Sequence, residues 1–213
     1  VRRMDWAVTA RTSDPHVRDL IADRELETWA LADLTASMDF GTAELAKRDL
    51  VIAAVGALGI LTARVGDRFG AYVLYGGAVH RYPARPGRAA LYGLLHSLMS
   101  VPPSGGTAEL GPAIDMLSAA HPRRGLRVIV SDFLEPPEAW ERPLRRLSAR
   151  QQVLAVEVID PRELELPDVG LVTFTDPETG RSRDVRLTRR LRAAYAEAAA
   201  AQREANRAAL RRA

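Results

Sequence analysis

The chain contains no cysteine and only one lysine, Lys47, among its 213 residues. Without cysteine it can form neither structural disulfides nor thiolate metal sites, and nothing in the composition indicates an oxidising compartment. The lysine does not follow a glycine-rich phosphate-binding loop, which excludes a Walker A nucleotide site. From the absence of cysteine, we expect a cytoplasmic protein.

The sequence also lacks an apolar run long enough to cross a bilayer. The longest run, LVIAAVGALGILTA from Leu50 to Ala63, falls short of the roughly 20 residues that a spanning helix requires. We interpret it as part of a buried helix that the rest of the fold must cover. The chain starts at Val1 with VRRMDW, without an initiator methionine or a signal-peptide pattern. We expect that upstream sequence has been removed, and membrane attachment through it is the exception to a cytoplasmic location.

Positive charge is not spread along the chain, although the formal net charge is +3. Residues 188–213 contain seven arginines and two glutamates, net +5, so the preceding 187 residues carry −2. A basic excess confined to one segment is typical of a solvated helix, with nucleic acid or an acidic lipid surface as the sharper alternative. We favour the solvated helix and expect no nucleic-acid partner.

Strand-like apolar segments alternate with segments of helical periodicity along the chain. Predicted strands cover residues 25–35, 66–76, 78–83, 126–133, 152–160 and 170–176, and predicted helices cover 43–64, 87–99, 108–121, 137–149 and the segment from Thr188 onward. This alternation predicts an α/β fold with a mostly parallel sheet and helices on both faces. The tight Gly76–Gly77 turn predicts one antiparallel edge strand.

We divide the chain into three parts on this basis. Residues 1–24 form an N-terminal segment that we expect to pack on the domain, and residues 25–187 form the α/β domain itself. Residues 188–213 form an Arg/Ala-rich C-terminal helix.

Oxygen-bearing side chains stand where a parallel sheet binds ligands, beyond the carboxyl ends of its strands. DLTAS places Asp33, Thr35 and Ser37 after the first strand, SGGT places Thr107 before a helix, and VIVSD ends in Asp132. Two carboxylates and three hydroxyls suit a hard cation such as Mg²⁺, Mn²⁺ or Ca²⁺, and Mg²⁺ commonly keeps several waters. Such a site leaves a coordination position for an acidic group of a partner or substrate.

DLTAS, GGT and SD together resemble the metal-ion-dependent adhesion site of von Willebrand factor A domains, whose motif reads D-x-S-x-S, then T, then D. The resemblance implies a von Willebrand factor A-like, Rossmann-like fold. It also implies that Thr35, Ser37 and Thr107 bind the ion directly, while Asp33 and Asp132 act mainly through water. The sequence departs from the motif at Thr35, where serine is usual, but the hydroxyl is retained.

Four longer stretches of the sequence are RRMDWAVTAR (2–11), HVRDLIADRELETWALADLTASMDFGT (16–42), KRDL (47–50) and GDRFGA (66–71). Together they resemble the bacterial family called domain of unknown function 58, whose members contain a von Willebrand factor A-like fold. Members are commonly encoded beside MoxR-type AAA+ ATPases, which are thought to mature other proteins or complexes, and many carry transmembrane helices before the first stretch. The resemblance implies a metal-dependent protein-interaction module, an accessory or adaptor that contacts such an ATPase or its client through an acidic residue at the metal.

Each candidate ligand also has a structural alternative. Thr107 and Ser37 are suited to cap helices, and Asp132 is suited to cap a helix or to pair with an arginine. We expect the three loops to meet, in motif order, at one edge of the sheet, and we therefore favour the metal site.

The sequence shows no recognisable enzyme signature. It has no G-x-S-x-G elbow, and its four histidines lack metal-binding spacing. DLTAS also lacks the second carboxylate of an aspartyl phosphatase, because Thr35 stands in its place. We expect no enzymatic activity. The alternative is a metal-dependent phosphoester hydrolase, for which no general base is evident.

Overall fold

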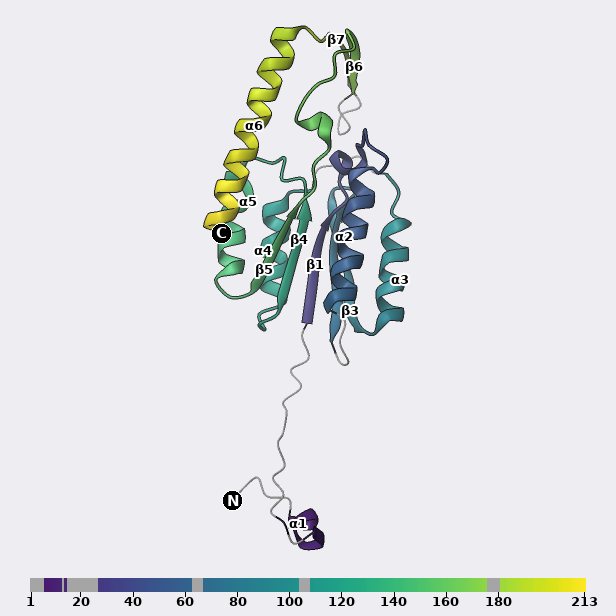
Figure 1. Cartoon of the computed structure of the whole chain (residues 1–213), viewed down its shortest axis with the longest axis vertical. Coiled ribbons are helices and arrows are strands. Elements are labelled where there is room, and N and C mark those ends of the chain that lie inside the picture. The colour runs from purple at the N-terminus through teal and green to yellow at the C-terminus, as the bar shows by residue number, and fades with distance from the viewer. Residues whose placement is uncertain (1–5, 13, 15–26, 63–66, 104–107, 176–180) are drawn as a thin grey trace.

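A five-stranded sheet with helices packed on both faces forms the body of the computed structural model (Figure 1). The structure describes residues 6–12, 14, 27–62, 67–103, 108–175 and 181–213. Its strands are β1 (Glu27–Asp33), β2 (Arg68–Tyr75), β3 (Ala78–Pro86), β4 (Leu126–Ser131), β5 (Gln152–Glu157), β6 (Leu171–Thr175) and β7 (Ser182–Arg186). Its α-helices are α1 (Trp6–Thr12), α2 (Lys47–Thr62), α3 (Arg88–Met99), α4 (Leu110–Ala120), α5 (Pro137–Ser148) and α6 (Arg189–Arg212), and two 3₁₀ turns are η1 (Ala36–Asp39) and η2 (Pro161–Glu163).

The strand order of the main sheet is β3-β2-β1-β4-β5. Strand β1 runs parallel to both β2 and β4, and β4 runs parallel to β5. Strand β3 is antiparallel to β2, as the glycine turn between them predicts. This arrangement confirms the predicted fold class, an α/β fold with a mostly parallel sheet and one antiparallel edge. It also places β1 and β4 side by side at the centre.

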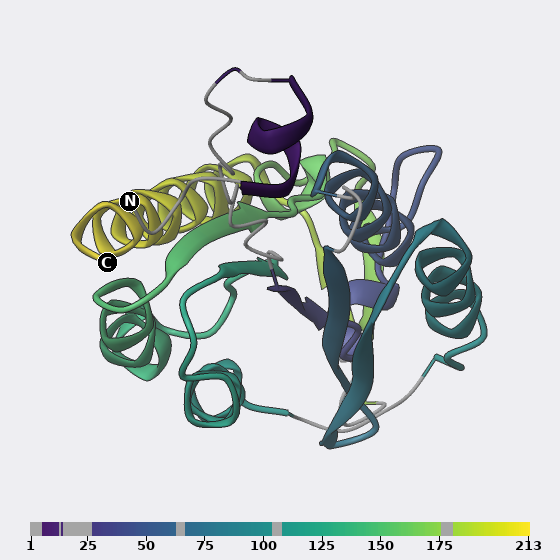
Figure 2. The ribbon, with the colours of Figure 1, turned by 90° about the horizontal axis from the view of Figure 1, so that it is seen from below.

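Strand β1 is apolar along most of its length because both faces of this central strand are buried. Successive side chains of a strand point to opposite faces. Trp29 and Leu31 accordingly join a core under α4, α5 and α6, whereas Ala30 and Ala32 join a core under α2 and α3. Figure 2 shows α2 and α3 on one side of the sheet and α4 and α5 on the other. Each fully buried large apolar side chain contributes about 1.5–3 kcal/mol to the stability of the fold. The centre of the sheet is therefore a stable support for the loops that follow its strands.

One predicted strand does not join the main sheet. Residues 170–176 were expected to continue the strand–helix alternation, but β6 pairs antiparallel with β7 in a separate two-stranded sheet. Strand β7, with the sequence SRDVR, was not predicted, because its polar composition hides it from a search for apolar segments. The small β6–β7 sheet lies beyond the same end of the main sheet as η2 (Figure 1).

Helix α2 is less covered than its sequence suggested. Val51 and Val55 are fully buried against the sheet, as expected for an apolar helix. However, Leu50 is 38% exposed, Ile60 is 43% exposed and Leu61 is 77% exposed. The prediction that the rest of the fold covers this helix on all sides is therefore wrong for the described residues.

Helix α6 packs on the domain through the C-terminal half of its length. Ala209 is fully buried in the core under α4 and α5, and the buried Asn206 donates a hydrogen bond of 2.9 Å from Nδ2 to the carbonyl of Phe133. At the other end, the Thr188 hydroxyl accepts from the backbone N–H of Leu191 and caps the helix. The basic C-terminal segment is thus a largely exposed helix that is buried near its C-terminal end and is also tied near its start by the ion pair of Arg192 with Asp168 at 2.8 Å.

None of the helices in the described part of the chain is both long and apolar enough to cross a membrane. The expectation that residues 1–24 pack on the domain concerns a segment that lies largely outside the described residues. It stays a prediction.

The crossing of α4 and α5 provides a test of this packing. A Cβ placed on Gly111 would lie 2.2 Å from the carbonyl oxygen of Ala139, so only glycine fits at this contact. We expect Gly111→Ala to lower the free energy of unfolding by about 1–3 kcal/mol, the usual effect of overpacking. Equilibrium urea denaturation measures the change.

Gly93 supplies the matched control, because it is also helical and a Cβ there would meet nothing within 4 Å. Gly93→Ala is expected to raise the free energy of unfolding by up to about 1 kcal/mol. Equal effects of the two substitutions would show that the close contact between α4 and α5 does not exist.

Candidate metal centre

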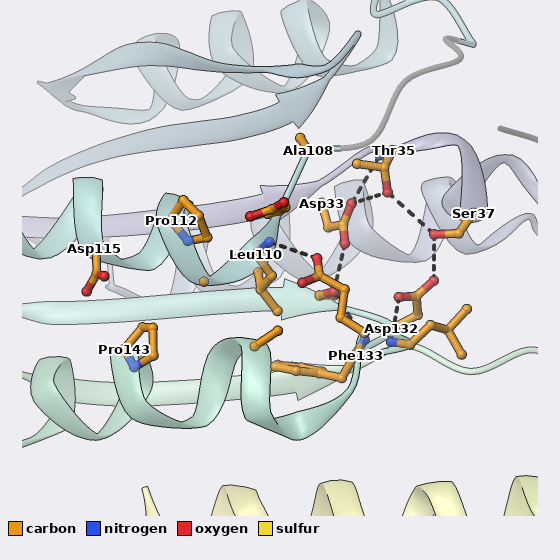
Figure 3. A pocket seen from close by; sticks show the side chains of 16 residues that line it. Asp33, Thr35, Ser37, Ala108, Leu110, Pro112, Asp115, Asp132, Phe133 and Pro143 are labelled. Carbon is orange, nitrogen blue, oxygen red and sulfur yellow. Dashed lines mark hydrogen bonds between the residues drawn. The ribbon is translucent and has the colours of Figure 1, made fainter.

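The candidate site lies where β1 and β4 end side by side (Figure 3). Ala32 of β1 pairs with Val130 of β4, so the next residues of both strands emerge at the same edge of the sheet. Asp33 ends β1, and Asp132 directly follows β4. Both side chains are buried, at 6% exposure. The parallel register therefore brings together two carboxylates that are 99 positions apart in the chain.

A continuous network of hydrogen bonds connects four of the five predicted ligands. The Oδ1 atom of Asp33 accepts from the hydroxyl of Thr35 at 2.6 Å and from its backbone N–H at 3.0 Å. The Ser37 hydroxyl donates to Asp132 Oδ2 at 2.8 Å and lies 3.4 Å from the Thr35 hydroxyl. Asp33, Thr35, Ser37 and Asp132 are thus one cluster. The fifth predicted ligand, Thr107, lies outside the described residues.

Neither Ser37 nor Asp132 caps a helix, which was the alternative role considered for both. Ser37 lies inside η1, and its hydroxyl points to Asp132. Asp132 Oδ1 accepts from the backbone N–H of Leu134 at 3.2 Å in a local turn, and Oδ2 pairs with a lysine instead of the arginine considered above.

The backbone after Asp132 has an uncommon conformation. Phe133 adopts φ = 51°, a left-handed value that costs a bulky residue energy. Its N–H donates to the Ser131 hydroxyl at 3.2 Å, its carbonyl accepts from Asn206, and its ring packs edge-on against Trp140. These contacts hold the turn in place, and they fix the direction in which Asp132 leaves the strand.

Ser131 is a site residue that the sequence alone did not single out. Its hydroxyl donates to Asp33 Oδ2 at 2.7 Å, so both carboxylate oxygens of Asp33 are engaged. Burial, followed by repulsion from Asp132, raises the pKa of Asp33 despite these hydrogen bonds. Two buried carboxylates this close favour a compensating cation.

Lys47 is the second residue that the sequence analysis missed. The first residue of α2, it is 1% exposed, and its Nζ lies 2.8 Å from Asp132 Oδ2 and within hydrogen-bond distance of Glu163. Burial disfavours its charge, but the carboxylates of Asp132 and Glu163 outweigh burial and raise the pKa of its ammonium. Its solitary occurrence in an arginine-rich chain was the available signal.

The segment around η2 holds Glu163 in place. Asp160 accepts from the N–H of Arg162 at 2.7 Å, while its own N–H donates to Glu163 Oε2 at 3.1 Å, which forms a capping box. Asp160 also accepts from the N–H and the hydroxyl of Thr42, at 2.7 and 2.6 Å. The loop after η1 and the loop after β5 are therefore joined beside the site.

A cavity of about 810 Å³ opens from the cluster between α4 and α5. Besides the four clustered residues, its lining includes Glu135, Glu109 and Asp115, with apolar walls that include Pro112 and Pro143 (Figure 3). Glu135 accepts from the N–H of Leu110 at 2.8 Å and so ties α4 to the loop after β4. Burial, supported by repulsion from nearby carboxylates, raises the pKa of Glu135.

Residues 1–205 match the model of a protein family described as "Protein of unknown function DUF58". The chain belongs to the DUF58 family. Two relatives of this DUF58 chain are uncharacterised proteins of Mycobacterium bovis and Mycobacterium tuberculosis, each 52% identical over 205 residues. The match covers 95% of this chain but only 64% of each relative, so the chain spans less than two thirds of their length.

Solved structures resemble this DUF58 chain in fold. An aerotolerance-related membrane protein from Bacteroides fragilis, 17% identical, superimposes over 87% of this chain and 99% of its own with a TM-score of 0.53. The VWA domain of SpRpn10, 14% identical, covers 63% of this chain and 89% of its own with a TM-score of 0.43.

The donor set of the DUF58 site fits a hard cation. Its four described ligand candidates all offer oxygen, and two of them are carboxylates. Within the described residues no three histidine, aspartate or glutamate side chains gather as a metal cluster, so a carboxylate cage is not what the site offers. Few protein ligands and several waters are the pattern of Mg²⁺.

The raised pKa of Asp33 predicts how pH affects the ion-free protein. Because the unfolded chain releases this proton at a lower pH than the folded chain, folding loses stability as the pH rises between the two pKa values. An asparagine side chain at this position cannot ionise. In EDTA, we expect Asp33→Asn to be at least as stable as the wild type at pH 7, and this advantage should shrink as the pH is lowered toward about 4, the ordinary aspartate pKa.

Chemical denaturation at a series of pH values measures this difference. A stability difference between the two proteins that does not change with pH would mean that the Asp33 carboxylate is not strained by its surroundings.

Proposed function

We propose that this DUF58 domain is a metal-dependent protein-interaction module. Asp33, Thr35, Ser37, Thr107 and Asp132 would hold one Mg²⁺, or Mn²⁺ or Ca²⁺ in its place. The observation that supports the proposal is the hydrogen-bonded cluster of four of these residues at the mouth of the cavity.

The side chains of the cluster have different roles in this proposal. The hydroxyl oxygens of Thr35 and Ser37, 3.4 Å apart, would be uncharged ligands of the ion. Asp33 orients the Thr35 hydroxyl, and Asp132 orients the Ser37 hydroxyl. When bound, the ion would supply an open coordination position for a carboxylate of a partner protein. With only two site carboxylates, the ion keeps charge available for that external group.

The partner that we propose is a MoxR-type AAA+ ATPase or its client, contacted through an acidic side chain. The support for this class of partner is the family resemblance, with the domain acting as an accessory or adaptor in the maturation of other proteins. The cavity beside the cluster offers room for the segment that carries the acidic residue.

We propose further that the domain is not an enzyme. A metal-dependent phosphoester hydrolase would use the same cluster, and Glu135 adds to the cavity a second carboxylate, besides that of Asp33, with a raised pKa. Glu135 already accepts the N–H of Leu110, so its first role is to hold α4. Purified protein with Mn²⁺ is expected to show no turnover of bis(p-nitrophenyl) phosphate; turnover that is lost in Asp132→Ala would support the hydrolase.

Calorimetric titration with Mg²⁺ and Mn²⁺ tests the metal site directly. Wild-type protein is expected to bind one ion saturably, and Asp33→Ala is expected to weaken binding by more than about 10-fold, because it removes both the charge and the orientation of Thr35. Asp115→Ala is the matched control: this side chain lines the same cavity but pairs with Arg146 at 2.7 Å. Equal binding by wild type and Asp33→Ala would refute the site.

The partner is tested by co-purification of the wild-type chain with a MoxR-type ATPase from the same genome, in Mg²⁺ and in EDTA. We expect a complex in Mg²⁺ that EDTA and Asp33→Ala both abolish, since ion-dependent binding must disappear with the ion. A complex that survives EDTA would contradict a metal-dependent contact.

A further inference from the structure

Lys47 is positioned unlike any surface lysine. It is the only lysine of the chain, it is 1% exposed, and its ammonium lies between Asp132 and Glu163. Burying a charge is costly unless it is paired, and removal of one partner leaves the other uncompensated. The positive charge of this ammonium and the negative charges of the carboxylates beside it must therefore compensate each other.

The contact with Asp132 connects this ammonium to the proposed metal site. Asp132 Oδ2 accepts from both Ser37 and Lys47 at 2.8 Å, while Oδ1 accepts from the N–H of Leu134. Two of these three donors would remain if an apolar side chain replaced Lys47. Lys47 therefore affects mainly the charge of the site, whereas Ser37 and the N–H of Leu134 hold Asp132 in position.

We propose that Lys47 is a built-in counter-cation that sets how tightly this site binds its metal ion. The inference rests on the proposed function. Without the ion, the ammonium compensates the buried carboxylates, so the fold does not depend on metal. With the ion, it repels the second cation and lowers the affinity. It also makes the summed charge of the ion, Asp33, Asp132 and Glu163 one unit more positive, 0 instead of −1, which favours an added carboxylate relative to a site without Lys47.

Substitutions of the ammonium and of its neighbour Glu163 give opposite predictions. Lys47→Met keeps the buried methylenes but removes the positive charge, so Mn²⁺ should bind about 10-fold or more tightly than to wild type. Glu163→Gln keeps the size and one hydrogen-bond acceptor but leaves Lys47 less compensated, so Mn²⁺ should bind about 10-fold more weakly. Arg48→Met is the control, because Arg48 pairs with Asp39 outside the site; its Mn²⁺ affinity should match wild type.

Thermal melts provide a readout that does not require a binding isotherm. In EDTA, Lys47→Met should melt well below wild type, because Asp132 and Glu163 lose their cation, and Mn²⁺ should restore most of the loss. The melting temperature of the wild type should rise much less when EDTA is replaced by Mn²⁺. Acetate, as a probe for the partner's carboxylate, should strengthen Mn²⁺ binding to wild type more than to Lys47→Met.

The outcomes separate this inference from the proposed function. Equal Mn²⁺ affinity of wild type, Lys47→Met and Glu163→Gln would overturn the role of Lys47 and leave the metal site intact. Failure of all three folded proteins to bind Mn²⁺ would overturn the proposed function and this inference with it. If Lys47→Met does not fold, Glu163→Gln decides alone, and unchanged or tighter binding overturns the inference.

Discussion

Two carboxylates buried side by side at the ends of β1 and β4 are the constraint around which this end of the domain is built. Each carboxylate would be unstable there without donors and a nearby positive charge. Ser131 and Thr35 supply the donors for Asp33, and Ser37, Leu134 and Lys47 supply those for Asp132. The loops that provide these groups are held in place by the same bonds.

This requirement extends outward from the site into distant parts of the chain. Lys47 is held by Glu163, which the capping box fixes to Asp160, and Asp160 in turn binds the loop at Thr42. On the other side, Asn206 of α6 holds the carbonyl of Phe133 directly after Asp132. The C-terminal helix and the η2 segment therefore support the proposed metal site indirectly, the helix through Phe133 and the η2 segment through Lys47.

The clustered side chains stand at or just beyond the ends of strands that are buried on both faces, so the ligands start from a fixed base. In the proposed function, an ion held by these ligands keeps a coordination position for a carboxylate of the partner protein. The DUF58 description carries no activity, and the contacts described above are the physical basis on which one can be sought.

The main sheet could be predicted from the residue pattern alone, since apolar strands such as β1 and β4 must be buried on both faces. The same pattern placed Asp33, Thr35, Ser37 and Asp132 at or just beyond strand ends. Only the tertiary structure revealed Lys47, Ser131 and Glu163 as their partners, because a polar side chain gives no periodic signal and its partners are chosen by distance in space. The sequence analysis also missed β7 and its pairing with β6, and it wrongly predicted that the rest of the fold covers α2. Local pattern predicts which strands are buried, whereas the cover of a helix and the pairing of distant segments depend on how the whole chain packs.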